Sequence, residues 1–253
     1  LVEEPMEAIR LLAADLDAQK QARVSTELGR IDAGLDRMRG LFKLINDVIR
    51  SDKDSLRPVP VDLRRLFRTE VRGLGEQIKD LRVYFQCEAG LESADGVVAR
   101  VDQEQFALVI QNLLTNMAKH ARDPKRDDLT VLVHVGTRTE PGRTWLVIMI
   151  ENNGKPFAEG FSHQDLVTFG KRLDSTNGNG IGGYLMDRII ANHHGRFSSG
   201  NLELDERTAR SSFAKDQRLD ENHWEPLDWE TGSTHMTVRF TIELPIDHPE
   251  DHD

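Results

Sequence analysis

The first fifty residues carry apolar side chains at alternating spacings of three and four. The longer stripe comprises Leu28, Ile31, Leu35, Met38, Phe42, Ile45 and Ile49, and a shorter one precedes it at Met6, Ile9, Leu12 (or Leu11) and Leu16. Such spacing is typical of bundle helices, in which a neighbouring helix covers the apolar face. The pattern predicts two helices over residues 6–50, with a reversal near 22–26.

Two arrangements would cover these stripes. The hairpin can pair with a second copy in a dimeric four-helix bundle, or it can pack against the rest of its own chain. The pattern alone does not choose between them. It does set a boundary, because Pro58 and Pro60 follow a charged stretch and end the helix. We therefore expect a helical hairpin at residues 1–54 and a second domain at 55–253.

The second domain mixes strand-like and helix-like patterns. Runs rich in β-branched residues predict strands near 59–61, 82–87, 96–101, 129–135, 144–150, 196–199 and 235–244. The strands at 82–87 and 96–101 follow each other in the sequence and are expected to pair. Helices are predicted from Asp62 to about residue 77, from Asp102 to about residue 121, and over 184–194, with the two Asp residues as N-caps.

An insertion at about residues 202–231 separates the last two strands. It carries Trp224, Trp229 and many charges. Loops of this length are uncommon in a compact domain unless they are functional or disordered. The tryptophans favour docking, either on a partner or on the sheet of the same domain.

Composition narrows the class of protein. Charged residues make up 30% of the 253 residues and hydrophobic ones 38%, with a net charge of −10. These values suit a globular chain in water and argue against a broad nucleic-acid surface. No segment has the apolar length of a membrane span, so no membrane contact is expected. The single cysteine, Cys87, excludes an internal disulfide and fits a reducing, cytoplasmic compartment.

Two polar stretches point to a phosphate-binding site. On a helix, Asn112, Asn116, Lys119 and His120 fall on one stripe beside an apolar one. An Asn carbonyl oxygen suits Mg²⁺, and an ammonium suits the phosphates that accompany Mg²⁺. Further along, the glycines within 178–183 open a helix whose first N–H groups can meet an anion. Each stretch alone also fits an ordinary solvated surface.

A third stretch, Ile-Glu-Asn-Asn-Gly-Lys-Pro-Phe at 150–157, lies between them. In this order, the three resemble the N, G1 and G2 boxes of the GHKL-type ATPases, and most of all the ATP-binding domain of bacterial sensor histidine kinases. The resemblance covers about residues 40–245. It implies an α+β fold, a two-layer α/β sandwich of Bergerat type with a mixed sheet and helices on one face. It also favours a helical hairpin that dimerises as a four-helix bundle.

The resemblance implies a role for each matching residue. Asn116 would coordinate Mg²⁺, with Asn112 one turn earlier on the same face, and Lys119 and His120 would contact phosphates or ribose. The other ATP-binding positions are Asn152, Gly154 and Phe157 in the G1 box, Gly178, Gly180, Ile181 and Gly182 in the G2 box, and Phe169, Lys171 and Arg172 at the start of a short lid. The two lid cations would meet the γ-phosphate. ATP and Mg²⁺ are therefore the expected ligands.

Two positions depart from the family pattern. Asn152 stands where the family has an Asp that accepts a hydrogen bond from the adenine amino group. The amide keeps an acceptor oxygen but lacks the charge, so weaker ATP binding is expected. Asn112 stands where the hydrolytic members have a Glu that activates water. The absence of a base at this position favours phosphoryl transfer over hydrolysis.

The phosphoaccepting histidine of the family is missing from the expected helix. None of the nine histidines lies in the first hundred residues, and the spacing to Pro5 places the acceptor one residue before Leu1. Three functions stay open. The chain can be a histidine kinase core that phosphorylates its homodimeric hairpin for relay to a response-regulator receiver domain. It can instead be a degenerate dimeric scaffold or phosphotransfer module, or a GHKL kinase acting on Ser, although that class lacks the long hairpin.

Overall fold

The computed structural model describes residues 56–78, 81–91, 96–121, 129–170, 180–202, 217–218 and 236–246, together with Ser25, Thr26, Leu28 and Gly29. The chain divides into two compact units, Leu1–Ile49 and Arg50–Asp253. In the first unit, the four described residues are helical, and Leu28 of the predicted stripe is buried. The rest of the hairpin, its dimerisation and a boundary at residue 54 lie outside the described residues and remain predictions.

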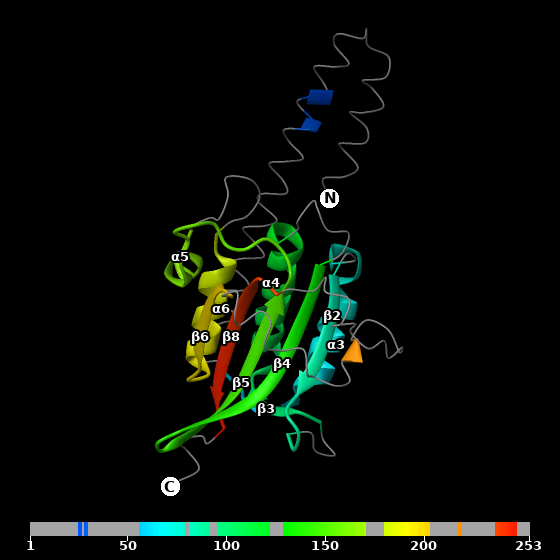
Figure 1. Cartoon of the computed structure of the whole chain (residues 1–253). Coiled ribbons are helices and arrows are strands. Elements are labelled where there is room, and N and C mark those ends of the chain that lie inside the picture. The colour runs from blue at the N-terminus through cyan, green and yellow to red at the C-terminus, as the bar shows by residue number, and fades with distance from the viewer. Residues whose placement is uncertain are drawn as a thin grey trace. The chain divides into compact units, whose positions relative to one another are not determined.

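A six-stranded mixed sheet forms the centre of the second unit (Figure 1). Its order is β6-β8-β5-β4-β2-β7, with β2 and β4 parallel and the other neighbours antiparallel. The strands are β2 (Leu81–Cys87), β4 (Leu129–Glu140), β5 (Arg143–Asn152), β6 (Arg196–Asn201), β7 (Gln217–Arg218) and β8 (Val238–Pro245). A second, two-stranded sheet consists of β1 (Val59–Asp62) and β3 (Val98–Val101).

One predicted pairing is wrong. The strands expected at 82–87 and 96–101 both form, but β2 pairs with β4 and β7, and β3 pairs with β1. Their burial explains the difference. Five of the first six residues of β2 are buried, as in a strand that is covered on both faces, whereas β3 alternates between exposed and buried positions, as in a strand covered on one face.

Three helices lie behind the sheet in Figure 1, namely α3 (Leu63–Leu74), α4 (Gln103–His120) and α6 (Gly182–Asn192). A 3₁₀ turn, η2 (Gly75–Ile78), follows α3, and the short α5 (His163–Val167) packs against α6 and β6. Because side chains alternate along a strand, one sheet face receives Val83, Val131 and Ile148, which share the main core with Phe106 and Ile110 of α4. A mixed sheet with helices on one face confirms the predicted fold class.

Both predicted N-caps are confirmed. Asp62 Oδ1 accepts from Arg64 N at 3.0 Å, and Asp102 Oδ1 accepts from Gln105 N at 3.0 Å. The backbone N–H of Asp102 also donates to Nε2 of His193, just after α6, at 2.8 Å. This bond ties the start of α4 to the end of α6, so the second half of α4 runs beside the start of α6. Within the described residues, no helix is long and apolar enough to cross a membrane.

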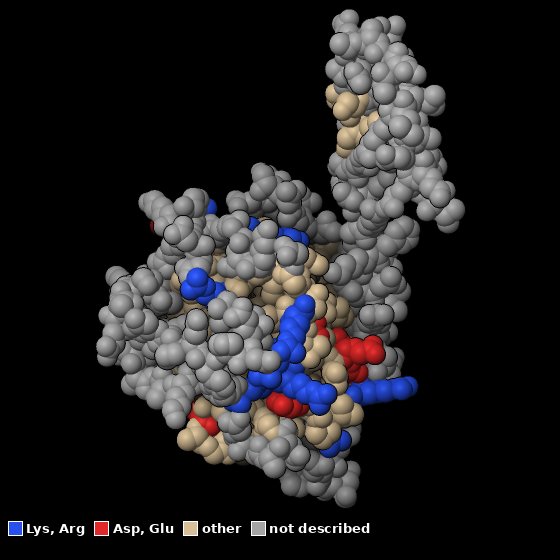
Figure 2. Space-filling view, turned by 90° about the vertical axis from the view of Figure 1, so that its right-hand side faces the viewer, with Lys and Arg blue, Asp and Glu red and all other residues tan. Residues whose placement is uncertain are grey.

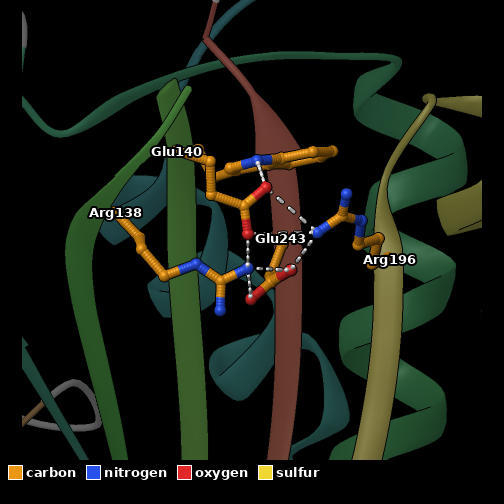
Figure 3. A network of polar contacts seen from close by, with 5 residues as sticks. Arg138, Glu140, Arg196 and Glu243 are labelled. Carbon is orange, nitrogen blue, oxygen red and sulfur yellow. Dashed lines mark hydrogen bonds and ion pairs between the residues drawn. The ribbon is translucent and has the colours of Figure 1, made fainter. Parts of the chain in front are cut away.

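A polar network lies next to the turn between β4 and β5 (Figure 3). Arg138 Nη2 lies 2.8 Å from Glu140 Oε1 and 2.9 Å from Glu243 Oε1, and Arg196 approaches the same two carboxylates at 3.4 and 3.8 Å. Trp145 is 2% exposed. Its indole N–H donates to Glu140 Oε2 at 2.9 Å, and the Arg196 guanidinium lies 4.3 Å from its ring centroid. The indole N–H, helped by Arg196 and Arg138, lowers the pKa of Glu140.

Candidate functional site

Helices α4 and α6 meet where two of the polar stretches lie. A Cβ added to Gly182, the first residue of α6, would lie 3.0 Å from Asn112 Oδ1 and 3.3 Å from Asn116 Nδ2. These separations are tighter than ordinary van der Waals contact, so glycine lets α6 begin this close to the Asn pair. Two segments far apart in the sequence thereby form one surface.

The two asparagines of that surface differ in their bonding. Asn112 Nδ2 donates to the Leu108 carbonyl at 2.8 Å, which fixes its carboxamide against α4. The half-buried carboxamide of Asn116 makes no hydrogen bond within the described part of the chain. Its oxygen is a hard ligand of the kind Mg²⁺ accepts, so Asn116 fits a metal contact better than Asn112 does. Lys119 is exposed and His120 half-buried one turn further on.

The turn after β5 reaches the end of α4. A Cβ on Gly154 would lie 2.1 Å from the Ala121 carbonyl oxygen, and Lys155 N donates to that oxygen at 2.7 Å. Neither backbone can move away without losing this bond, so glycine is required at residue 154. The third predicted stretch therefore joins the other two at the C-terminal half of α4.

Asn152 lies at the end of β5 and is 1% exposed. Its Oδ1 accepts from Gly154 N at 3.0 Å. Because a backbone N–H can only donate, this bond fixes which side of the carboxamide carries the oxygen. Thr237, just before β8, holds the same turn. Its hydroxyl donates to the backbone carbonyl of Gly154 at 2.6 Å and lies 3.1 Å from the backbone carbonyl oxygen of Asn152.

The remaining predicted residues fall into three groups. Phe157 packs on Phe161 and Phe240, with ring centroids 5.5 and 5.9 Å away, so its ring belongs to the core that supports the turn. Phe169 is 60% exposed, and its ring meets the edge of Tyr184 on α6. Lys171, Arg172 and Gly178 lie outside the described residues.

The start of α6 has features that favour an anion. Ile181, its N-cap residue, is buried and offers no side-chain cap, and the first turn holds no acidic residue. The first amides of a helix point along its axis and favour negative charge. Just upstream, Gly170 N donates to the Gly180 carbonyl at 2.9 Å, which joins the two ends of segment 171–179.

Comparison with known proteins identifies the domain. The family model described as "Histidine kinase-, DNA gyrase B-, and HSP90-like ATPase" matches residues 101–247. The chain belongs to this ATPase family. No curated protein matches the sequence.

Solved structures share the fold of this ATPase domain. The crystal structure of full-length ShkA in complex with AMPPNP aligns with a TM-score of 0.52 and 16% identity, over 96% of this chain and 43% of that one. The Acinetobacter baumannii histidine kinase AdeS aligns with a TM-score of 0.50 and 10% identity, over 98% of both chains. The suspected relation to the catalytic core of sensor histidine kinases is thereby confirmed at the level of family and fold.

The ATPase domain contains one site residue that the sequence did not reveal. Thr237 falls inside a segment that pattern reasoning assigned to a strand, and nothing in that pattern distinguishes its hydroxyl from that of any other strand Thr. Its importance depends on β8 lying beside β5, which brings Thr237 N within 2.7 Å of the Asn152 carbonyl. Only the sheet order reveals this contact.

One histidine near α6 has a perturbed titration. His163 opens α5, with Nδ1 3.1 Å from Ser199 Oγ and its ring against Phe197. Burial lowers the pKa of His163, and the nearby carboxylate of Asp187 on α6 only partly opposes the shift. Neutral imidazole is therefore the form that fits between α5, α6 and β6.

Proposed function

We propose that this domain binds Mg²⁺-ATP and transfers the γ-phosphoryl group to a histidine of a dimeric helical hairpin, from which a response-regulator receiver domain takes it. Membership of the ATPase family supports the nucleotide. The observation that carries the proposal is the convergence of three segments on the second half of α4. Gly182 meets Asn112 and Asn116 there, and Gly154 meets Ala121.

Each segment has a physical task in this proposal. The carboxamide of Asn116, which makes no hydrogen bond among the described residues, would hold Mg²⁺, and the ion would neutralise charge on the phosphates. The amides at the start of α6 bind phosphate oxygens, and Lys119 adds a cation at the rim. The turn at 152–154, held by Thr237, is shaped to lie under the base. Lys171 and Arg172 would complete the contacts to the γ-phosphate.

Transfer is favoured over hydrolysis by the side chain at position 112. A carboxamide takes no proton from water, and the Asn112 amide is already bonded to the Leu108 carbonyl. An imidazole nitrogen needs no such base, because it presents a lone pair at neutral pH. It attacks the γ-phosphorus, the bond to the β-phosphate oxygen breaks, ADP leaves, and the imidazole proton passes to solvent.

The test is Mg²⁺-dependent ATP binding by calorimetry. Asn116→Ala should lower the affinity at least about tenfold in the presence of Mg²⁺, because a metal ligand is lost. Thr115→Ala is the matched control on α4, since the Thr115 hydroxyl donates to backbone carbonyls of its own helix, those of Gln111 and Asn112. Unchanged affinity in Asn116→Ala would refute the proposed site.

A dimeric scaffold without kinase activity is the second candidate. The uncharged Asn152 at the predicted adenine contact favours it, and none of the nine histidines lies in the first hundred residues given. Among the later histidines, His193 is 4% exposed, and its ring nitrogens contact Asp102 N and the Ile189 carbonyl, both at 2.8 Å, so it is no acceptor. Incubation with γ-labelled ATP separates the two candidates. Acid-labile label on a full-length parent with a hairpin histidine supports the kinase, and its absence supports the scaffold.

A further inference from the structure

The carboxamide of Asn152 has one branch bonded and one branch without a partner. Its Oδ1 accepts from Gly154 N at 3.0 Å, whereas its Nδ2 makes no hydrogen bond with any described residue. The residue is nevertheless only 1% exposed. A buried donor without an acceptor costs free energy, and such groups are rare in folded proteins. The Nδ2 branch therefore indicates a ligand with an acceptor atom at this place.

The two branches cannot change places while the turn after β5 keeps its shape. A rotated carboxamide would set Nδ2 against Gly154 N, donor against donor. The Gly154 carbonyl accepts from the Thr237 hydroxyl at 2.6 Å, and Lys155 N donates to the Ala121 carbonyl at 2.7 Å. Moving Gly154 to accommodate the rotated amide would break these bonds. The branch left for a ligand is therefore the donor.

The groups bonded to Asn152 carry no charge. Besides Gly154 N, they are the backbone N–H and the hydroxyl of Thr237, which lie 2.7 and 3.1 Å from the Asn152 carbonyl oxygen. The Lys and Arg side chains visible in Figure 2 gather on the side of the domain that carries β2 and α3, whereas Asn152 ends β5. Discrimination at Asn152 therefore depends on hydrogen-bond donors and acceptors rather than on charge.

An Asp at this position would have the opposite polarity. A carboxylate has almost the same shape as a carboxamide, but both of its oxygens accept. With one oxygen on Gly154 N, the other would receive the amino group that adenine carries at C6. In Asn152 the same branch is an NH₂ group, which meets that amino group donor to donor. Guanine and hypoxanthine carry an oxygen acceptor at C6 instead.

We propose that the site binds a 6-oxopurine nucleotide, GTP or ITP, more tightly than ATP, with Asn152 as the residue that sets the preference. The inference rests on the proposed function, because that function places the base at the turn 152–154. Asn152 Nδ2 donates to the oxygen at C6, so the buried amide gains the acceptor that it lacks among the described residues. ATP still binds, without this bond. The departure from Asp then changes which base is preferred, rather than marking the loss of nucleotide binding.

Calorimetry of the full chain in Mg²⁺ tests the preference. ITP differs from ATP only at the C6 edge of the base, and it should bind about threefold more tightly, as expected for one neutral hydrogen bond. ATP binding as tight as that of ITP, or tighter, would overturn the inference. GTP as tight as ITP would assign guanine as the base. Weaker GTP would assign hypoxanthine, because guanine carries an additional amino group at C2.

The same titrations separate this inference from the proposed function. Tight ATP with weak ITP would leave the proposed site intact and overturn the base preference alone. It would also assign the adenine amino group to another acceptor, such as the Thr237 hydroxyl oxygen. Binding of neither nucleotide would overturn the proposed function, and the base preference with it.

A pair of variants shows whether Asn152 sets the preference. Asn152→Asp should reverse the order, so that ATP binds more tightly than ITP, because the donor branch becomes an acceptor. Thr237→Val is the matched control at the same turn. It loses the bond to the Gly154 carbonyl and should weaken both nucleotides by the same factor. An unchanged order in Asn152→Asp, or a reversed order in Thr237→Val, would contradict the assignment. Should Asn152→Asp fail to fold, the comparison of ITP with ATP in the wild type still decides.

Discussion

Polar side chains gather at both ends of β5 with opposite outcomes. Where β5 begins, Arg138, Glu140 and Glu243 bind one another, and Trp145 completes the network. Beyond its end, the Asn116 carboxamide has no partner among the described residues, and α6 starts without a side-chain cap. Groups that satisfy one another stabilise a fold, whereas unbonded groups at a tightly packed junction indicate a ligand. The end with fewer charges is therefore the candidate site.

The largest effect on stability is expected from adding one methyl group at the turn that follows β5, where the candidate site lies. Gly154→Ala should destabilise the domain by at least about 3 kcal/mol in urea denaturation, because the new Cβ overlaps the Ala121 carbonyl. Gly200→Ala on β6 is the control, since a Cβ there meets nothing within 4 Å. Similar midpoints for the two variants would mean that the turn is not packed against α4 as described.

A smaller change, about fivefold in affinity, should follow from Asn152→Asp. The Asn152 oxygen accepts from Gly154 N, so the variant converts the other branch of the side chain from a donor into an acceptor. ATP binding should tighten more than GTP binding, because only adenine carries an amino donor at the matching edge. Any free-energy cost of burying the new Asp carboxylate is the same for both nucleotides, so it cancels when their affinities are compared. Equal changes for both would place Asn152 outside the base pocket.

A pH-dependent effect of a few degrees in Tm is expected at His163. Because burial lowers its pKa in the folded state, the unfolded chain takes up a proton first as the pH falls below about 6.5. Stability from the neutral ring is complete above that pH and is lost as the pH falls through the lowered pKa. His163→Gln should flatten the profile between pH 7 and pH 5. A variant with the same slope as the wild type would assign the titration to another group.

The smallest effect should come from the charged network. Arg138→Met breaks two ion pairs at an exposed position, where solvent screens the charges and such pairs contribute little to stability. Tm should fall by a few degrees at most, and ATP affinity should not change. A loss of affinity in this variant would show that the two ends of β5 are coupled, against the division drawn between them.

Local chemistry in the sequence predicted much of the fold. The caps at Asp62 and Asp102 and the apolar stripe of α4 could be read directly, because each depends on residues within one or two turns. The partner of β2 could not, since β4 lies more than forty residues away and pairing depends on which faces are buried. Thr237 was missed for the same reason. Gly182 lies against Asn112 and Asn116, and Gly154 lies against Ala121, but the roles of the predicted site residues and their contacts to nucleotide remain predictions.

The bond between Gly170 and Gly180 has a consequence for chain length. Since it already holds the ends of segment 171–179 together, the entropy of closing that loop is lost when the domain folds, not when anything binds. Closure entropy grows only with the logarithm of length, so doubling the segment would cost about 0.6 kcal/mol. Residues can therefore be inserted or deleted between these two glycines with little effect on where α6 begins.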